Sequence, residues 1–233
     1  MKRNISLSVV LPAYNEGENI EKTLSGAISY LENNLKEYEV IVVNDGSKDN
    51  TGEIVQELAS SDPRVILLNH HHNQGYGAAL RTGFEKASLE YVFLMDSDGQ
   101  FDISELDKFF PYLDESTVVI GYRGKRADSF IRTLNALLYH VYIRIVFGLK
   151  ARDIDCAFKV FPRIAYERVK SIRSGGALFS AEFLIKLKRV GYKIKELPVS
   201  HYPRLFGKQT GADINVIFRM FKDCWKLRNE LRS

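Results

Sequence analysis

The sequence predicts an α/β fold, in which a mostly parallel sheet is flanked by helices. Four short apolar runs alternate with three segments of helical spacing along the first half of the chain. The apolar runs are rich in Val, Ile, Leu and Phe, and each of them ends in polar residues. Buried parallel strands have this composition, and the connections between them are usually helices.

The elements are expected to alternate from the first strand, SLSVVLPA (6–13), and the first helix at 16–35. The later elements follow the same order, with strands at 38–45, 64–70 and 91–98 and helices at 50–61 and 75–88. Because the carboxyl ends of parallel strands meet at one edge of the sheet, the polar segments PAYNE, NDGS and DSDGQ should converge there.

The second half of the chain predicts C-terminal amphipathic helices. Its most apolar stretch, LNALLYHVYIRIVFGL, is interrupted by His140 and Arg144 and is too short to span a bilayer. Within the terminal segment 213–233, an apolar stripe lies beside basic residues, with Ile214, Ile217, Phe218, Phe221 and Trp225 in the stripe and Arg219, Lys222, Lys226 and Arg228 beside it. Such a helix either lies in an anionic headgroup layer or packs on the sheet.

We expect a single domain over residues 1–233 with two unlike halves, although the length alone would also allow two small domains. A chain of 233 residues with 45% hydrophobic residues can bury a continuous core. Residues 1–122 hold 9 basic and 20 acidic side chains, a net charge of −11, whereas residues 123–233 hold 24 and 9, a net charge of +15. This asymmetry suggests two different ligands or surfaces, although a basic half can also be a solvated surface.

Cysteine usage and the N-terminus favour the cytoplasm. Cys156 and Cys224 are the only cysteines and form no C-x-x-C pair, which suits a reducing compartment. The first residues begin with basic side chains but soon meet Pro12 and acidic residues, so they do not predict a signal peptide.

The ends of the first and fourth strands narrow the class of ligand. The first strand leads into PAYNEGEN rather than G-x-G-x-x-G, and no G-x-x-x-x-G-K-[ST] occurs, which disfavours dinucleotide-binding and phosphate-loop folds. The fourth strand leads into Asp96, Asp98 and Asp102, which repel one another unless a cation or a positively charged partner lies among them. The alternative is an acidic turn before a helix, and Asp102 is expected as that helix cap.

Four motifs, VVLPAYNEGENI, VIVVNDGSKDNT, NQGYGAALRTGFEKA and FLMDSDGQFD, resemble the successive signatures of family 2 inverting glycosyltransferases with the Rossmann-like GT-A fold. They cover the first half of the chain, so the resemblance implies that residues 1–122 are the nucleotide-sugar-binding half and residues 123–233 the acceptor- or membrane-facing half. RDIDCAFKVF, SAEFLIKLKRVGYKIKELPV and HYPRLFGKQTG in the second half resemble the branch of polyprenyl-phosphate, or dolichyl-phosphate, mannose and glucose synthases.

The resemblance implies a divalent cation, Mg²⁺ or Mn²⁺, which assists departure of the nucleoside diphosphate. Asp96 and Asp98 are the expected ligands, and Gln100 is an additional neutral oxygen ligand. Asp98 is also expected to be catalytic and Asp96 to contact the nucleotide. Side chains two apart in a strand point to the same side, so both carboxylates should face the same ligand.

The resemblance also implies the nucleotide contacts. Pro12, Tyr14 and Glu16 are expected to form the floor beneath the base and ribose, and Asp45 to hydrogen-bond the base or ribose. Structural roles are expected for two other groups, with Asp49 and Thr51 as helix caps and His70, His71 and His72 in a solvated loop.

The basic half is expected to bind an anionic acceptor, because a phosphate monoester is ionised near neutral pH and needs no general base. Arg123, Arg126 and Arg132 are the candidates for contacting the acceptor phosphate. Arg204 and Lys208 lie where the family places sugar-nucleotide or lipid-phosphate contacts. A solvated role remains the alternative for each of these residues.

Three further carboxylates are catalytic candidates by the resemblance. Asp153 and Asp155 in RDIDCAFK lie where the family has an acidic residue beside the reacting sugar, with Ala157 and Lys159 as departures from the family pattern. Glu182 matches the catalytic-base region of relatives with hydroxyl acceptors, and pairing with a neighbouring Lys or Arg is the alternative.

The sequence thus predicts metal-dependent inverting transfer of one sugar from a nucleoside-diphosphate sugar, of the GDP-mannose or UDP-glucose type, to a polyprenyl phosphate. The protein is expected at the cytoplasmic face of the membrane, through peripheral contact or a membrane partner protein, without a nucleic-acid partner. Transfer to a sugar hydroxyl, a non-catalytic sugar-nucleotide-binding module and a sugar-1-phosphate nucleotidyltransferase are the alternatives, and the last lacks its Gly-rich loop.

Overall fold

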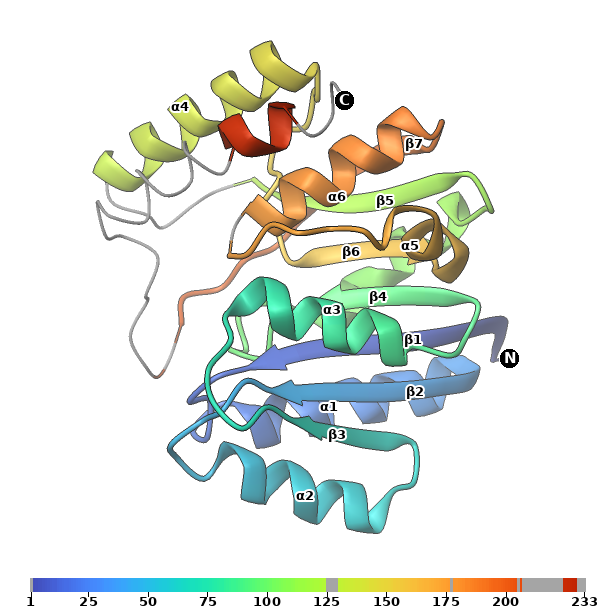
Figure 1. Ribbon diagram of the computed structural model, residues 1–233. Coiled ribbons are helices and arrows are strands. Elements are labelled where there is room, and N and C mark those ends of the chain that lie inside the picture. Colours follow the sequence, from blue (N-terminus) through green and yellow to red (C-terminus); the bar gives the residue numbers. More distant parts are fainter. Residues whose placement is uncertain (1, 125–129, 177, 205, 207–223, 230–233) are drawn as a thin grey trace.

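The computed structural model describes residues 2–124, 130–176, 178–204, 206 and 224–229, and for residues 130–138 it describes the backbone alone. A sheet crosses the centre of this part of the molecule, and helices lie on both of its faces (Figure 1). Its strands are β1 (Arg3–Ala13), β2 (Leu35–Asn44), β3 (Val65–Asn69), β4 (Tyr91–Met95), β5 (Thr117–Arg123), β6 (Phe158–Pro162) and β7 (Lys193–Val199).

The strand order is β3-β2-β1-β4-β6-β5-β7. All of these strands run in the same direction except β6, which is antiparallel to both of its neighbours, β4 and β5. The predicted mostly parallel sheet is therefore confirmed. Strands from both halves of the chain hydrogen-bond within this one sheet.

The helices of the first half begin and end within a few residues of the predicted bounds. They are α1 (Ile20–Asn34), α2 (Thr51–Ser61) and α3 (Tyr76–Lys86), followed after β4 by the short 3₁₀ helices η1 (Ile103–Lys108) and η2 (Phe110–Tyr112). The second half contributes α4 (Phe130–Phe147), α5 (Arg163–Val169) and α6 (Leu178–Arg189).

The sheet separates two hydrophobic cores. Figure 1 shows the helices that cover them on the two faces of the sheet. Successive residues of β1 point to opposite faces, so Val10 packs with α3 and α6 while Val9 and Leu11 pack with α1 and η1. All three side chains are fully buried. Burial on both faces explains why the strands appear in the sequence as continuous apolar runs rather than alternating ones.

The fourth strand is shorter than predicted, because it ends at Met95. Asp96 and Asp98 lie in the turn that follows, with Ser97 buried between them. The prediction that they share one side of a strand is wrong in its geometry. The Ser97 hydroxyl donates to the carbonyl oxygen of Pro12 at 2.7 Å, which ties this turn to the end of β1.

The helix α4 and the helical residues 224–229 lie beyond the β5–β7 end of the sheet (Figure 1). Cys224 and Leu227 are buried against the core, whereas Trp225 is 61% exposed. Most of the predicted terminal stripe, from Ile214 to Phe221, lies outside the described residues. Within the described ranges, no helix combines the length and the apolar character needed to cross a membrane.

Candidate active site

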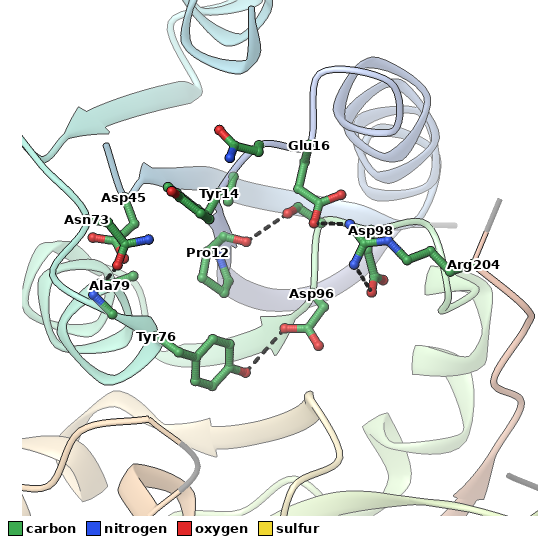
Figure 2. A pocket seen from close by; sticks show the side chains of 14 residues that line it. Pro12, Tyr14, Glu16, Asp45, Asn73, Tyr76, Ala79, Asp96, Asp98 and Arg204 are labelled. Carbon is green, nitrogen blue, oxygen red and sulfur yellow. Dashed lines mark hydrogen bonds and ion pairs between the residues drawn. The ribbon is translucent and has the colours of Figure 1, made fainter. Parts of the chain in front are cut away.

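A pocket of about 640 Å³ opens at the carboxyl edge of the sheet (Figure 2). The ends of β1, β2 and β4, the start of α3 and one residue of the second half line it, namely Pro12, Ala13, Tyr14, Asn15, Glu16, Asp45, Asn73, Gly75, Tyr76, Ala79, Asp96, Ser97, Asp98 and Arg204. Six of the predicted nucleotide and metal residues from the first half therefore lie in one cavity, and Arg204 joins them from the second half.

The loop after β1 is held in place by the loop after β2. Asn15 has a left-handed φ of 55°, and its backbone N–H donates to the Ser47 hydroxyl at 2.9 Å. The backbone N–H groups of Glu16 and Gly17 donate to Thr51 at 2.8 Å and to Asp49 at 3.0 Å. Asp49 and Thr51, predicted as helix caps, therefore hold this loop as well, while the N-cap of α2 is Asn50.

Asp45 lies at the end of the pocket next to Asn73 and Gly75. Its carboxylate accepts hydrogen bonds from the backbone N–H groups of Gln74 at 2.9 Å and Gly75 at 2.8 Å. The ring of His70 lies 2.6 Å from the same carboxylate and 2.9 Å from the Thr82 hydroxyl. The predicted solvated role is therefore wrong for His70, whose side chain is only 9% exposed, and holds for His71 and His72.

Asp96 and Asp98 lie at the other end of the pocket. The Tyr76 hydroxyl donates to Asp96 at 3.2 Å (Figure 2). Burial, and next the charge of Asp98, raise the pKa of Asp96 to about 7. The two carboxylates therefore repel each other in a partly desolvated part of the pocket. A cation bound between them would lower this repulsion.

Arg204 reaches the pocket from the second half and contacts two carboxylates. Its guanidinium lies 2.5 Å from Glu16 and 3.6 Å from Asp98. The amide of Asn19 also donates to Glu16, at 2.9 Å. Burial nevertheless raises the pKa of Glu16. Glu16 is thus a buried anchor for Arg204 as well as part of the pocket wall.

The donor chemistry of the pocket fits a hard divalent cation. Two carboxylates supply oxygen ligands, and Mg²⁺ is usually bound by one or two carboxylates together with substrate phosphates and water. In the described part of the chain, no cluster of three or more His, Cys, Asp or Glu side chains could hold a metal ion by itself. Asp96 and Asp98 could therefore hold a cation here only together with further oxygen ligands from a substrate or water.

Gln100 does not share the position of the two aspartates. Its side-chain amide donates to the carbonyl oxygen of Tyr202 at 2.8 Å, and the Tyr202 N–H donates back to the Gln100 carbonyl oxygen at 2.9 Å. It is outside the set of described residues that line the pocket. Gln100 therefore holds the segment 200–204 through these two hydrogen bonds. Asp102 caps η1 by accepting the Ser104 N–H, as predicted.

Arg123 and Asp153, predicted in separate roles, form an ion pair. The guanidinium of Arg123 donates twice to the Asp153 carboxylate, at 2.7 Å and 2.9 Å. Although burial alone would lower it, these bonds raise the pKa of Arg123. Arg123 is therefore already bound to a buried carboxylate, which limits how it can meet an acceptor phosphate.

Asp155 is placed differently from Asp153. One of its oxygens is buried without a hydrogen-bond partner among the described residues, and the other lies 3.9 Å from the His140 ring. Buried Lys159 is near this carboxylate and near Asp96, and burial lowers the Lys159 pKa. Asp155 therefore differs from Asp153 in having an oxygen without a partner among the described residues. Lys159 is a buried basic residue near Asp96 and Asp155 that was not among the predicted site residues.

Glu182 is completely buried and holds a loop. It lies 2.5 Å from Lys186 and accepts the Ser174 N–H at 2.8 Å. Burial alone would raise its pKa, but Lys186 and Ser174 hold the pKa below its ordinary value. This geometry supports the structural alternative for Glu182.

Three predicted basic residues cannot be placed. Arg126 and Lys208 lie outside the described residues, and Arg132 belongs to α4 in the stretch where the backbone alone is described.

Tyr76, Asn73 and His70 are the site residues that sequence reasoning missed. Tyr76 lies at the start of the helix predicted at 75–88, where a single tyrosine gives no separate signal of a ligand contact.

Comparison with protein families gives a match to the model described as glycosyl transferase family 2, over residues 8–170. Among curated proteins, a dolichyl-phosphate beta-glucosyltransferase of Trichomonas vaginalis is 34% identical over 218 residues, which cover 85% of this chain and 66% of that protein. The human dolichyl-phosphate beta-glucosyltransferase is 34% identical over 187 residues, which cover 71% of this chain and 57% of that protein. The chain spans 51% to 66% of the length of the first three such relatives.

Solved structures share the fold at low identity. Glucosyl-3-phosphoglycerate synthase from Mycobacterium tuberculosis, in complex with Mn²⁺, UDP-glucose and phosphoglyceric acid, has a TM-score of 0.71 at 18% identity, covering 97% of this chain and 80% of that chain. Mannosyl-3-phosphoglycerate synthase from Rubrobacter xylanophilus has a TM-score of 0.74 at 16% identity, covering 98% and 76%. These similarities concern the fold alone.

Proposed function

Because this chain belongs to glycosyltransferase family 2 and has the GT-A fold, we propose that it transfers a single sugar, with inversion, from a nucleoside-diphosphate sugar to a polyprenyl phosphate. The observation that carries the proposal is the pocket itself, with Asp45 at one end and the pair Asp96 and Asp98 at the other. This separation suits a ligand whose base and diphosphate lie at opposite ends. We also propose that residues 1–233 act as one domain.

The chain's own residues would bind and orient the donor. Asp96 and Asp98 would hold a divalent cation, Mg²⁺ or Mn²⁺, which when bound would neutralise charge on the diphosphate. Arg204, which pairs with Glu16 and Asp98, lines the same end of the pocket, and its guanidinium would donate to the diphosphate oxygens there. Pro12 and Tyr14 form part of the wall towards the base and ribose.

The transfer itself is a single displacement. An acceptor phosphate oxygen forms a bond to the anomeric carbon of the sugar while the bond from that carbon to the diphosphate oxygen breaks. The nucleoside diphosphate leaves with the electron pair. Because the acceptor is already an anion, no side chain has to remove a proton from it. Glu182 is not needed as a base in this mechanism, and its carboxylate is bound to Lys186 and the Ser174 N–H.

The acceptor is proposed on two grounds. The relatives named above are dolichyl-phosphate glucosyltransferases, so a polyprenyl phosphate is the acceptor class that their names suggest. The second half of this chain also carries a net charge of +15. Arg126, Arg132 and Lys208, whose side chains lie outside the described part of the chain, are proposed contacts to the acceptor phosphate. Arg123, which Asp153 orients, is proposed as a further contact.

Asp155 is the proposed partner of the transferred sugar. Its buried oxygen without a hydrogen-bond partner among the described residues is the kind of acceptor that a sugar hydroxyl can satisfy. Its negative charge would also stabilise the positive charge that develops on the sugar ring. Asp153, already bound to Arg123, is proposed to orient that arginine rather than to touch the sugar.

Contact with the cytoplasmic face of a membrane is proposed through the end of the molecule that carries α4. Val141 is 43% exposed and Ile145 is 77% exposed on this helix, with exposed Arg144 between them in sequence. Trp225 is 61% exposed on residues 224–229, beside exposed Lys226. Exposed apolar side chains next to basic ones are what an anionic headgroup layer binds.

The test is a transfer assay with radiolabelled UDP- and GDP-sugars, with and without EDTA, on a short polyprenyl phosphate and on the matching polyprenol. We expect a labelled lipid product from the phosphate alone, dependent on Mg²⁺ or Mn²⁺. Product from the polyprenol at an equal rate would favour a hydroxyl acceptor. Nucleotide binding without transfer to either lipid, or to added sugars, would favour a non-catalytic module.

A further inference from the structure

Asp45 is the anchor of the loop that forms one wall of the pocket. Its Oδ1 accepts from the His70 ring at 2.6 Å and from the Gln74 N–H at 2.9 Å, and its Oδ2 accepts from the Gly75 N–H at 2.8 Å. Gly46, with a left-handed φ of 69°, lets the loop approach, because a Cβ there would lie 2.4 Å from the His72 backbone. The loop and the strand end thus form one rigid unit.

The roles of donor and acceptor in this unit follow from chemistry. A carboxylate oxygen can only accept, so the Nδ1 of His70 must carry the hydrogen that points at Asp45. In the neutral ring, Nε2 is then an acceptor, and the Thr82 hydroxyl donates to it at 2.9 Å. Thr82 on α3 therefore holds the ring that in turn holds Asp45.

The three hydrogen bonds leave Asp45 little capacity for a ligand. An ionised carboxylate has about four acceptor sites. Both sites of Oδ1 and one site of Oδ2 are used by His70, Gln74 and Gly75. Counting the described residues, one site on Oδ2 is left, and Asp45 lines the pocket.

One remaining acceptor discriminates between bases. Uracil presents a single N–H, between two carbonyl groups. Guanine presents a ring N–H and an amino group side by side, and a carboxylate satisfies both only if both of its oxygens are available. A donor left unpaired at a desolvated site weakens binding by about tenfold or more.

We infer that His70 is a positioning residue that leaves Asp45 with one free acceptor site, so that the pocket selects a base with a single N–H donor on that edge, as in uridine diphosphate, over guanosine diphosphate. This inference rests on the proposed function, because it takes Asp45 as the contact to the base. It adds a base preference and assigns roles to His70 and Thr82.

The test is calorimetric titration of the protein with UDP, GDP and IDP in the presence of Mg²⁺. Inosine has the purine ring of guanosine without the amino group, so the ratio of the GDP and IDP dissociation constants isolates that group. We expect the wild type to bind UDP more tightly than GDP, and IDP more tightly than GDP by about tenfold.

The variants ask whether His70 causes the preference. His70→Ala removes the hydrogen bond to Oδ1 of Asp45 and should bring the ratio of the GDP and IDP dissociation constants close to one. His70→Asn keeps a donor near the Nδ1 position and should retain most of the preference, whereas Thr82→Val should weaken it partly. His71→Ala, at an exposed neighbour in the same loop, is the matched control and should behave as wild type. Thermal melting of each variant shows whether the loop change unfolds the protein.

The results separate the two proposals. If the wild type binds UDP and transfers sugar but His70→Ala keeps the wild-type ratio, the inference about His70 is wrong and the proposed function stands. A wild-type preference for GDP over IDP also overturns it. If the wild type binds none of the three nucleotides, the proposed function fails, and the inference fails with it.

Discussion

Asp98 contributes a carboxylate to the pocket and no volume to the core, since it lies beyond the end of β4. Asp98→Asn should therefore lower the transfer rate by about 100-fold or more while leaving the melting temperature nearly unchanged. Initial rates at saturating Mn²⁺ and a thermal melt of the same sample measure both. Asp102→Asn, which alters the cap of η1 and keeps a capping side chain, is the matched control. Near wild-type turnover by Asp98→Asn would remove this residue from the proposed site.

Asp96 should make the metal-free protein less stable as the pH rises. Its pKa is raised to about 7, mainly by burial, against an ordinary value near 4, so between these values the folded state keeps a proton that the unfolded chain has released. The contribution to the free energy of unfolding is full at low pH and is lost as the pH rises through 7. The free energy of unfolding can be measured with urea, in EDTA, at pH 5 and at pH 8. Between these values it should fall by on the order of 2 kcal/mol more in the wild type than in Asp96→Asn. Equal pH dependence in the two proteins would contradict the buried state of this carboxylate.

The roles of single residues were harder to predict than their location. Asp96, Asp98, Asp45 and Glu16 line one pocket, as expected, because strand-end polar motifs converge at one sheet edge. His70 was misjudged, because a hydrogen bond from the end of one strand to the end of the next joins residues 25 apart and leaves no local pattern.

Glu182 connects α6 to the loop before it, so its loss should affect folding more than chemistry. Glu182→Gln breaks a buried pair with Lys186 and should lower the free energy of unfolding by about 3 kcal/mol. The rate per folded molecule should be unchanged with a polyprenyl phosphate acceptor. Glu167→Gln on α5 removes a half-exposed ion-pair partner and should cost less than about 1 kcal/mol. A stable but inactive Glu182→Gln would instead point to a catalytic base and a hydroxyl acceptor.

The strands and helices of the first half were predictable because hydrophobic period and composition are local properties. The predicted strand at 64–70 is observed at Val65–Asn69 and the helix at 50–61 at Thr51–Ser61. The ends were less accurate. The fourth strand stops at Met95 because its partner β6 begins opposite that residue, at Phe158, a tertiary pairing that no local pattern encodes. The Arg123–Asp153 pair is another such contact, because it joins the end of β5 to a loop of the second half.

The charge asymmetry and the exposed apolar residues of α4 lead to a prediction for the whole molecule. The protein should pellet with anionic liposomes at low ionic strength and less so at high ionic strength, because the attraction is screened. Ile145→Glu should reduce pelleting. Ile164→Glu, an exposed position on α5, is the matched control. Equal binding to neutral vesicles would argue against electrostatic docking.

The antiparallel strand β6 affects how the chain can fold as it is made. It lies between β4 and β5 in the sheet although it follows both of them in the chain. While the chain is being synthesised, β4 and β5 therefore cannot be linked in the sheet before β6 has been made. Until residues 158–162 emerge, each of the two strands has backbone N–H and C=O groups without their partners on β6. At ordinary rates of synthesis this interval lasts roughly a few seconds. During that time the ribosome-bound chain presents an open β-edge to its neighbours, and a chaperone that covers such an edge would raise the yield of folded protein.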